Sequence, residues 1–175
     1  METVKGPDSS QEKWLIQIID QYQASLLQIC FMYLHDRTMA EDAVQETFLK
    51  AYKSMAAFRG ECSEKTWLTR IAINTCRDMK RSAWCRHIDR RLTPDDLPPL
   101  SVQPSDHSDA QELALAIVKL PSKFKEVILL YYYQDMTMRE IAQALGIAVS
   151  SVYGRLKQAC EKLRKVLEKE DGDGR

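Results

Sequence analysis

Residues 138–158, MREIAQALGIAVSSVYGRLKQ, contain a short helical pattern, a glycine and a second helical pattern. Thr137 precedes the first pattern and Glu140 follows three residues later, which predicts a capping box at the start of a helix. Gly146 suits the left-handed conformation in which many helices end. The stretch therefore predicts a helix-turn-helix, with helices at about 137–145 and 149–169.

The second of these helices has a side that suits contact with DNA. Its buried stripe is expected to consist of Val152, Leu156, Ala159, Cys160 and Leu163. The opposite side then carries small residues first and cations one turn later, as a recognition helix does in the major groove. The spacing is also compatible with an ordinary helical hairpin. Gly154 favours DNA binding, because glycine inside a helix costs about 1 kcal/mol relative to alanine. The expected outward residues are Ser150, Ser151, Gly154, Arg155, Lys157 and Gln158.

The charges of the chain are segregated, although its 25 Lys+Arg balance 25 Asp+Glu. Residues 1–58 hold 5 basic and 8 acidic side chains, and residues 59–91 hold 9 and 4. Residues 92–112 hold 0 and 5, and residues 113–175 hold 11 and 8. Nucleic-acid binding depends on the local potential at the contact face, so overall neutrality does not exclude it.

Helical periodicity dominates the chain, and strand signals are almost absent. We therefore expect an all-α fold. In the first half, periodic segments lie at about 12–34, 39–55 and 63–83. Thr38 and Glu41 predict a second capping box at the start of the middle segment.

Residues 86–108 contain prolines and acidic residues without periodicity, which predicts an extended linker. The linker divides the chain into two small helical domains, at 12–85 and 109–170. In the second domain, further helices are expected at about 109–119 and 121–133.

Several classes of protein do not match the sequence. It has no membrane span and no secretory signal at its start, so we expect a cytoplasmic protein. Its five cysteines form no CxxC pair, and its three histidines form no ligand pattern with them. Paired carboxylates, a nucleophile with a base, and a phosphate loop are also missing. We expect no catalytic residues, metal, cofactor or small-molecule substrate.

Two further surfaces allow two interpretations each. Around the third helical segment, aromatic residues such as Phe58 and Trp67 alternate with cations, which suits single-stranded nucleic acid. A core aromatic beside a solvated basic face would give the same pattern. On the second segment, Leu49 lies among acidic residues on the outward side. That face could dock a basic partner helix or could simply be solvated.

Four motifs occur in one order: AEDAVQETFLKAY, then FRG and TWLTRIAINTCRD, then the proline-rich linker, then LPSKFKEVILLYYYQDMTMREIAQALGIAVSSVYGRLKQACEKLR. This order resembles the bacterial sigma factors of the extracytoplasmic-function (ECF) group of the sigma-70 family. The resemblance covers about residues 12–168. It implies a promoter-specificity subunit of RNA polymerase.

The resemblance also implies roles for single residues. The first domain, sigma region 2, would dock on the β′ clamp helices of core RNA polymerase through Asp42, Gln45, Glu46 and Leu49. It would melt promoter DNA and bind the −10 element through Phe58, Arg59, Ser63, Asn74 and Arg77. The second domain, sigma region 4, would contact the β flap and bind the −35 element through Ser150, Ser151, Gly154, Arg155 and Lys157.

The family resemblance further implies an anti-sigma factor, often anchored in the membrane, and a role in a stress or envelope response. The alternative is a stand-alone helix-turn-helix transcriptional regulator, whose residues 1–85 would sense a ligand or dimerise. That alternative predicts tight binding to duplex DNA without polymerase.

Overall fold

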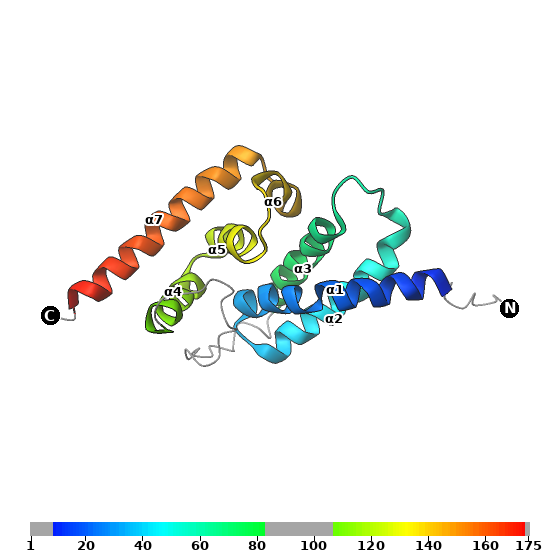
Figure 1. The fold of residues 1–175 in the computed structure, drawn as a ribbon, viewed down its shortest axis with the longest axis horizontal. Coiled ribbons are helices and arrows are strands. Elements are labelled where there is room, and N and C mark those ends of the chain that lie inside the picture. Colours follow the sequence, from blue (N-terminus) through cyan, green and yellow to red (C-terminus); the bar gives the residue numbers. More distant parts are fainter. Residues whose placement is uncertain (1–8, 83–106, 174–175) are drawn as a thin grey trace.

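A computed structural model describes residues 9–82 and 107–173 of the chain. Every regular element in these two ranges is a helix, as the sequence predicted (Figure 1). The predicted linker, 86–108, lies outside the described residues except at its end. There, His107 already begins a helix, so the last two residues of the predicted linker are helical.

Two groups of helices make up the described chain. The N-terminal bundle (residues 9–82) consists of α1 (Ser9–Leu34), α2 (Arg37–Ser54), the 3-10 turn η1 (Met55–Ala57) and α3 (Glu64–Arg81). The C-terminal bundle (residues 107–173) consists of α4 (His107–Lys119), α5 (Ser122–Ile128), the π-helical segment η4 (Leu129–Tyr133), α6 (Met138–Leu145) and α7 (Val149–Asp173).

The start of α2 differs from the prediction. Asp36 is the N-cap, and its carboxylate accepts a hydrogen bond from the backbone N–H of Met39 at 3.0 Å. The predicted capping box of Thr38 and Glu41 is therefore wrong. The chain reverses at His35, which has a left-handed φ of 61°, and this places Asp36 in the extended conformation that an N-cap needs.

The core of the N-terminal bundle combines large and small side chains. Leucine and isoleucine residues of α1 and α3 are almost completely buried, among them Leu26, Ile29 and Leu68. Across from them, Ala40 and Ala43 of α2 are fully buried. Small side chains let helix backbones approach closely, so α2 packs against both α1 and α3.

The helix-turn-helix forms as predicted in the C-terminal bundle. Thr137 and Glu140 make a complete capping box at the start of α6, and Gly146 ends this helix with a φ of 66°. Four of the five residues predicted for the buried stripe of α7 are buried. The exception is Cys160, which is exposed and has its Sγ 3.9 Å from the Tyr132 hydroxyl.

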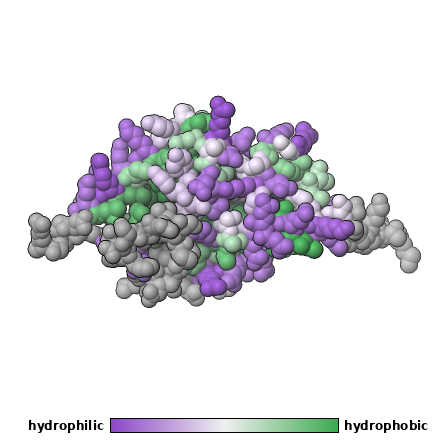
Figure 2. Space-filling model, in the orientation of Figure 1, coloured by the Kyte–Doolittle hydropathy of each residue, from purple (hydrophilic) through white to green (hydrophobic). Residues whose placement is uncertain are grey.

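The two bundles pack against each other. Helix α6 contacts α3 as well as α7, and α5 and η4 contact α1. In Figure 1 the end of the C-terminal bundle that contains α5 and α6 lies beside α3 and α1. Hydrophilic side chains predominate on the face shown in Figure 2, and apolar ones show mainly beside α7. None of the helices in the two described ranges is both long and apolar enough to cross a bilayer.

Candidate functional site

The predicted polymerase-binding residues form one outward face of α2. Asp42, Gln45 and Leu49 are exposed, and Leu49 is 54% accessible. Glu46 is half-buried, and its carboxylate lies 3.7 Å from the ammonium of Lys50. The structure therefore places an exposed leucine on an acidic surface, a combination that suits a partner helix with apolar and basic side chains.

A cleft of about 340 Å³ lies at the start of α3. Phe58 and Arg59 line it from the loop before the helix, and Trp67 and Arg70 line it from the helix. The Phe58 and Trp67 rings are stacked, with centroids 4.6 Å apart and planes at 28°. Aromatic faces and cations in one open cleft are the groups that bind unstacked bases and phosphates.

Ser63 has a structural role in the same loop. It is the N-cap of α3, and its hydroxyl accepts a hydrogen bond from the backbone N–H of Thr66 at 3.1 Å. The two hydroxyls of these residues also lie 2.9 Å apart. The side chain of Ser63 thus fixes the beginning of α3 beside the cleft.

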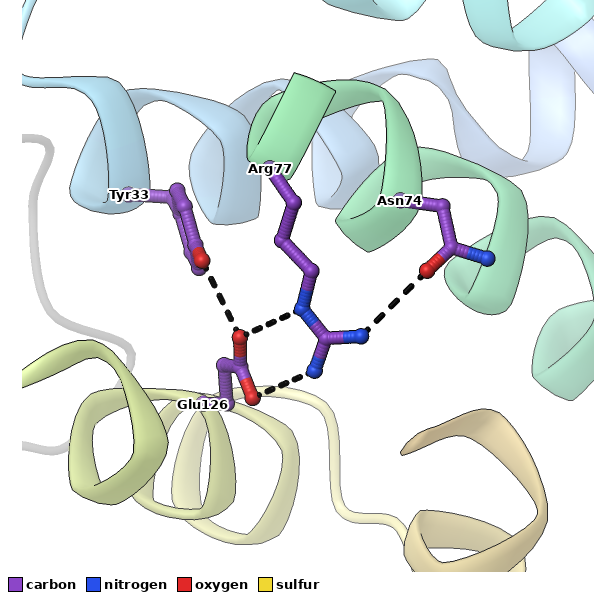
Figure 3. A network of polar contacts seen from close by, with 4 residues as sticks. All are labelled: Tyr33, Asn74, Arg77 and Glu126. Atoms are coloured by element: carbon purple, nitrogen blue, oxygen red, sulfur yellow. Dashed lines mark hydrogen bonds and ion pairs between the residues drawn. The ribbon is translucent and has the colours of Figure 1, made fainter. Parts of the chain in front are cut away.

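Asn74 and Arg77, the other residues predicted for the −10 element, lie further along α3 and away from the cleft residues. In Figure 3 the Arg77 guanidinium points across to Glu126 of α5. Its Nη1 donates to the Asn74 side-chain oxygen at 3.3 Å. Hydrogen bonds from Arg77 to the Glu126 carboxylate raise the pKa of Arg77. The structure therefore divides the predicted −10 residues between the loop that leads into α3, with Phe58, Arg59 and Ser63, and the later part of α3, with Asn74 and Arg77.

The predicted recognition helix is accessible at the start of α7. Ser150, Ser151 and Lys157 are exposed, whereas Gly154 and Arg155 are half-buried. A Cβ added at Gly154 would meet nothing within 4 Å. Tyr153, which was not among the residues predicted to contact DNA, is 63% accessible on the same helix. Its place in the helical period, one residue after buried Val152, could have indicated this exposure.

Two buried charged residues lie between the bundles, and the sequence did not predict their burial. Lys125 and Glu126 are adjacent on α5, and each is only 2% accessible. The Lys125 ammonium lies 2.8 Å from Nε2 of His35. Burial, with the nearby charge of Lys80, lowers the pKa of Lys125 to about 7. The only hint in the sequence is that apolar residues flank the two charges on both sides.

Comparisons with known proteins match both bundles. The family model for sigma-70 region 2 matches residues 18–86, and the model for sigma-70 region 4 matches residues 110–163. The ECF RNA polymerase sigma factor SigW of Bacillus subtilis is 31% identical over 176 aligned residues, which cover 94% of each chain.

Two solved structures share the fold. CnrH, solved in complex with the cytosolic domain of CnrY, superposes with a TM-score of 0.68 at 24% identity, covering 90% of each chain. The sigma factor RpoE of Bartonella quintana, solved with the anti-sigma factor NepR, gives a TM-score of 0.67 at 22% identity, covering 89% of this chain and 98% of that one. Given the two matched regions and the SigW relative, the chain belongs to the ECF sigma factors of the sigma-70 family.

Proposed function

We propose that this protein binds core RNA polymerase and directs it to promoters by contacting their −10 and −35 elements. The observation that carries the proposal is that both sigma regions occur in one chain in the family order. Each also has accessible groups of the chemistry its task requires. The N-terminal bundle acts as region 2 and the C-terminal bundle as region 4, joined through residues 86–108.

The outward face of α2 docks on the β′ clamp helices. Leu49 supplies an apolar contact that is already solvent-exposed, and Asp42 and Glu46 supply negative charge around it. Charge complementarity then sets the orientation of the complex. Leu49 contributes to the affinity because it becomes buried when the complex forms.

The cleft at the start of α3 takes bases of the melted −10 element. Phe58 and Trp67 present aromatic surface to an unstacked base, and Arg59 meets the phosphates. Asn74 and Arg77 contact the same strand further along α3. Removing a base from the stack costs a few kcal/mol, which stacking and hydrogen bonding in the cleft offset.

The start of α7 enters the major groove of the −35 element. The hydroxyls of Ser150 and Ser151 lie in its first turn, and Arg155 and Lys157 follow one to two turns later. Arg and Lys bind guanine edges or phosphates, and serine hydroxyls bind either. Gly154 permits close approach of the backbone to the DNA. The C-terminal bundle also contacts the β flap, which holds it at the −35 position.

An anti-sigma factor regulates the protein, in a stress or envelope response. The support is the pairing of a fold neighbour, the sigma factor RpoE, with the anti-sigma factor NepR. The protein works in the cytoplasm, where the polymerase is, and an anti-sigma factor anchored in the membrane would hold it at that surface.

Transcription with purified core polymerase tests the proposal. Fragmented genomic DNA of the source organism is the template, and the 5′ ends of the transcripts are sequenced. We expect new start sites that core polymerase alone does not use, with shared sequences near −10 and −35. No new start site, or no binding to core polymerase, would refute the proposal. Tight binding to duplex DNA without polymerase would instead favour a stand-alone regulator.

A further inference from the structure

Tyr153 is the most exposed large hydrophobic residue of the two described ranges, with 63% of its surface accessible. A single exposed apolar residue is ordinary on a protein surface. Tyr153, however, has an apolar neighbour, because Val149, four residues earlier in α7, is 45% accessible. Residues four apart adjoin each other on a helix surface, so the two form one exposed strip, which we name the Val149–Tyr153 strip.

The strip lies at the end of α7 that is proposed to meet DNA. Helix α7 begins at Val149, beside α6 (Figure 1), and the N-terminal part of a recognition helix enters the major groove. Ser150 precedes Tyr153 by three residues and Lys157 follows it by four, so both adjoin the ring on the helix surface. Both are exposed. The strip therefore lies next to the polar side chains that are proposed to contact the −35 element.

Gly154 leaves room beside the ring. It follows Tyr153 directly in the chain, and a Cβ added to it would meet nothing within 4 Å. A position without a side chain lets another molecule approach the helix backbone closely. Close approach of DNA at Gly154 brings the ring of Tyr153 to the edges of the base pairs.

The chemistry of the major groove selects what such a strip can contact. The base edges there present hydrogen-bond donors and acceptors, and thymine alone adds an apolar group, its C5-methyl. Covering a donor or acceptor with an apolar side chain costs free energy, whereas covering a methyl group gains it. The Val149–Tyr153 strip is therefore complementary to thymine and not to the edges of a G·C pair.

The length of the strip sets how many base pairs it covers. Residues four apart are about 6 Å apart along a helix, at a rise of about 1.5 Å per residue. Successive base pairs of B-form DNA are about 3.4 Å apart along its axis. The strip therefore covers one or two adjacent base pairs.

We propose that Tyr153 is a further specificity residue for the −35 element, and that its ring contacts a thymine methyl group beside the apolar surface of Val149. The −35 element accordingly contains an A·T pair at the place where the strip enters the groove. Serine hydroxyls bind several kinds of polar edge, so they discriminate less than a contact that only thymine can make. This inference rests on the proposed function of α7 and adds a residue and a base to it.

Two other uses of an exposed tyrosine make different predictions. A tyrosine hydroxyl also binds phosphates, which carry no sequence information. Such a contact would be lost in Tyr153→Phe, whereas a contact between the ring and a methyl group would be kept. A ring that met a protein surface would change binding to core polymerase and leave the discrimination between bases unchanged.

Replacing thymine by uracil tests the proposal, because it removes only the C5-methyl group. Holoenzyme is assembled from core polymerase and full-length protein, and it binds promoter duplexes identified in the transcription experiment. Each thymine of the −35 element is replaced in turn, on either strand, and filter binding gives the ratio of the two affinities. The variants are Tyr153→Ala and Tyr153→Phe. Tyr132→Ala is the matched control, because Tyr132 is 49% accessible and lies on η4, outside α7.

We expect uracil at one or two −35 positions to lower the affinity of the wild-type holoenzyme about fourfold, the effect of one buried methyl group. Tyr153→Ala should bind the thymine duplex more weakly and should bind the thymine and uracil duplexes equally at that position. Tyr153→Phe and Tyr132→Ala should keep the wild-type ratio.

Four results would overturn the proposal. The −35 sequence could contain no A·T pair, or no uracil substitution could change the wild-type affinity. Tyr153→Ala could keep the wild-type ratio, whether or not its binding to core polymerase falls. Finally, Tyr153→Phe could weaken binding to the thymine duplex as much as Tyr153→Ala, which would assign the hydroxyl to a phosphate.

Failure of the proposed function would look different. In that case the wild-type protein would give no specific transcripts with core polymerase, and this inference would fall with it. Specific transcription by the wild-type protein, without a thymine preference that depends on Tyr153, would overturn this inference alone.

Discussion

Nε2 of His35 and Nζ of Lys125 lie 2.8 Å apart, although the two residues belong to different bundles. Burial, together with the positive charges of Lys125 and Lys80, lowers the pKa of His35 to about 3 from 6.5. At neutral pH the imidazole is therefore uncharged, and its Nε2 accepts a hydrogen bond from Lys125 whenever that amine is protonated. The contact joins the end of α1 to α5 beside the Glu126 network.

This pair makes stability depend on pH. A base whose pKa is lower in the folded chain than in the unfolded chain binds fewer protons when folded. The contribution of neutral His35 to the free energy of unfolding is therefore fully present above pH 6.5. It is lost as the pH falls from 6.5 towards 3. Allowing for partial exposure, we expect the free energy of unfolding to fall by about 1 kcal/mol between pH 7.5 and 5.5 because of His35.

Urea denaturation at these two pH values, followed by circular dichroism, measures the effect. His35→Asn is the matched control, because asparagine tolerates the left-handed φ of 61° at this position and does not titrate. The variant should lose the His35 share of the pH dependence. An unchanged slope in the variant would show that another group is responsible.

Leu49→Ala should weaken binding to core polymerase by about tenfold, because it removes apolar area that becomes buried in the complex. Its effect on the free energy of unfolding should stay within about 0.5 kcal/mol, since Leu49 is exposed. Ile16→Ala is the control, as Ile16 is similarly exposed on α1. Surface plasmon resonance against immobilised core polymerase gives the affinities of both variants. Equal affinities for the two variants would show that α2 is not part of the docking surface.

Arg155→Ala should reduce initiation from promoters that depend on the −35 element, at a cost of about 1–3 kcal/mol in promoter binding. Binding to core polymerase should not change. Arg164→Ala, at an exposed arginine later in α7 whose Nε lies 3.5 Å from Glu168, serves as the control. Run-off transcription and core-binding assays separate the two effects. A parallel loss in both assays would mean that Arg155 acts through the structure of the helix.

Gly154→Ala should stabilise the protein by up to about 1 kcal/mol, because alanine favours the helix and the added methyl group meets nothing. It should nevertheless weaken −35-dependent initiation if the glycine allows close approach to DNA. Thermal denaturation and run-off transcription provide the two measurements, with Lys165→Ala as the control on an exposed, later part of the same helix. A stabilised variant with unchanged promoter binding would show that the glycine has no role at the DNA.

Local features of the fold could be predicted from sequence where neighbouring residues decide them. The Thr137–Glu140 capping box and the left-handed Gly146 depend on residues within one turn, and both formed as predicted. The start of α2 was mispredicted, because both Asp36 and Thr38 are good N-cap residues. The reversal of the chain at His35 selected Asp36.

The sequence by itself determined that the chain is helical, that it has two sigma regions, and which side of α2 and α7 faces outward. Only the tertiary structure decided that Arg77 pairs with Glu126, 49 residues away in the chain. Helical periodicity marks which positions are apolar, but a charged residue on a polar face has the same pattern whether it meets water or another helix. The partner of such a residue depends on how the bundles pack, and that is a property of the folded chain.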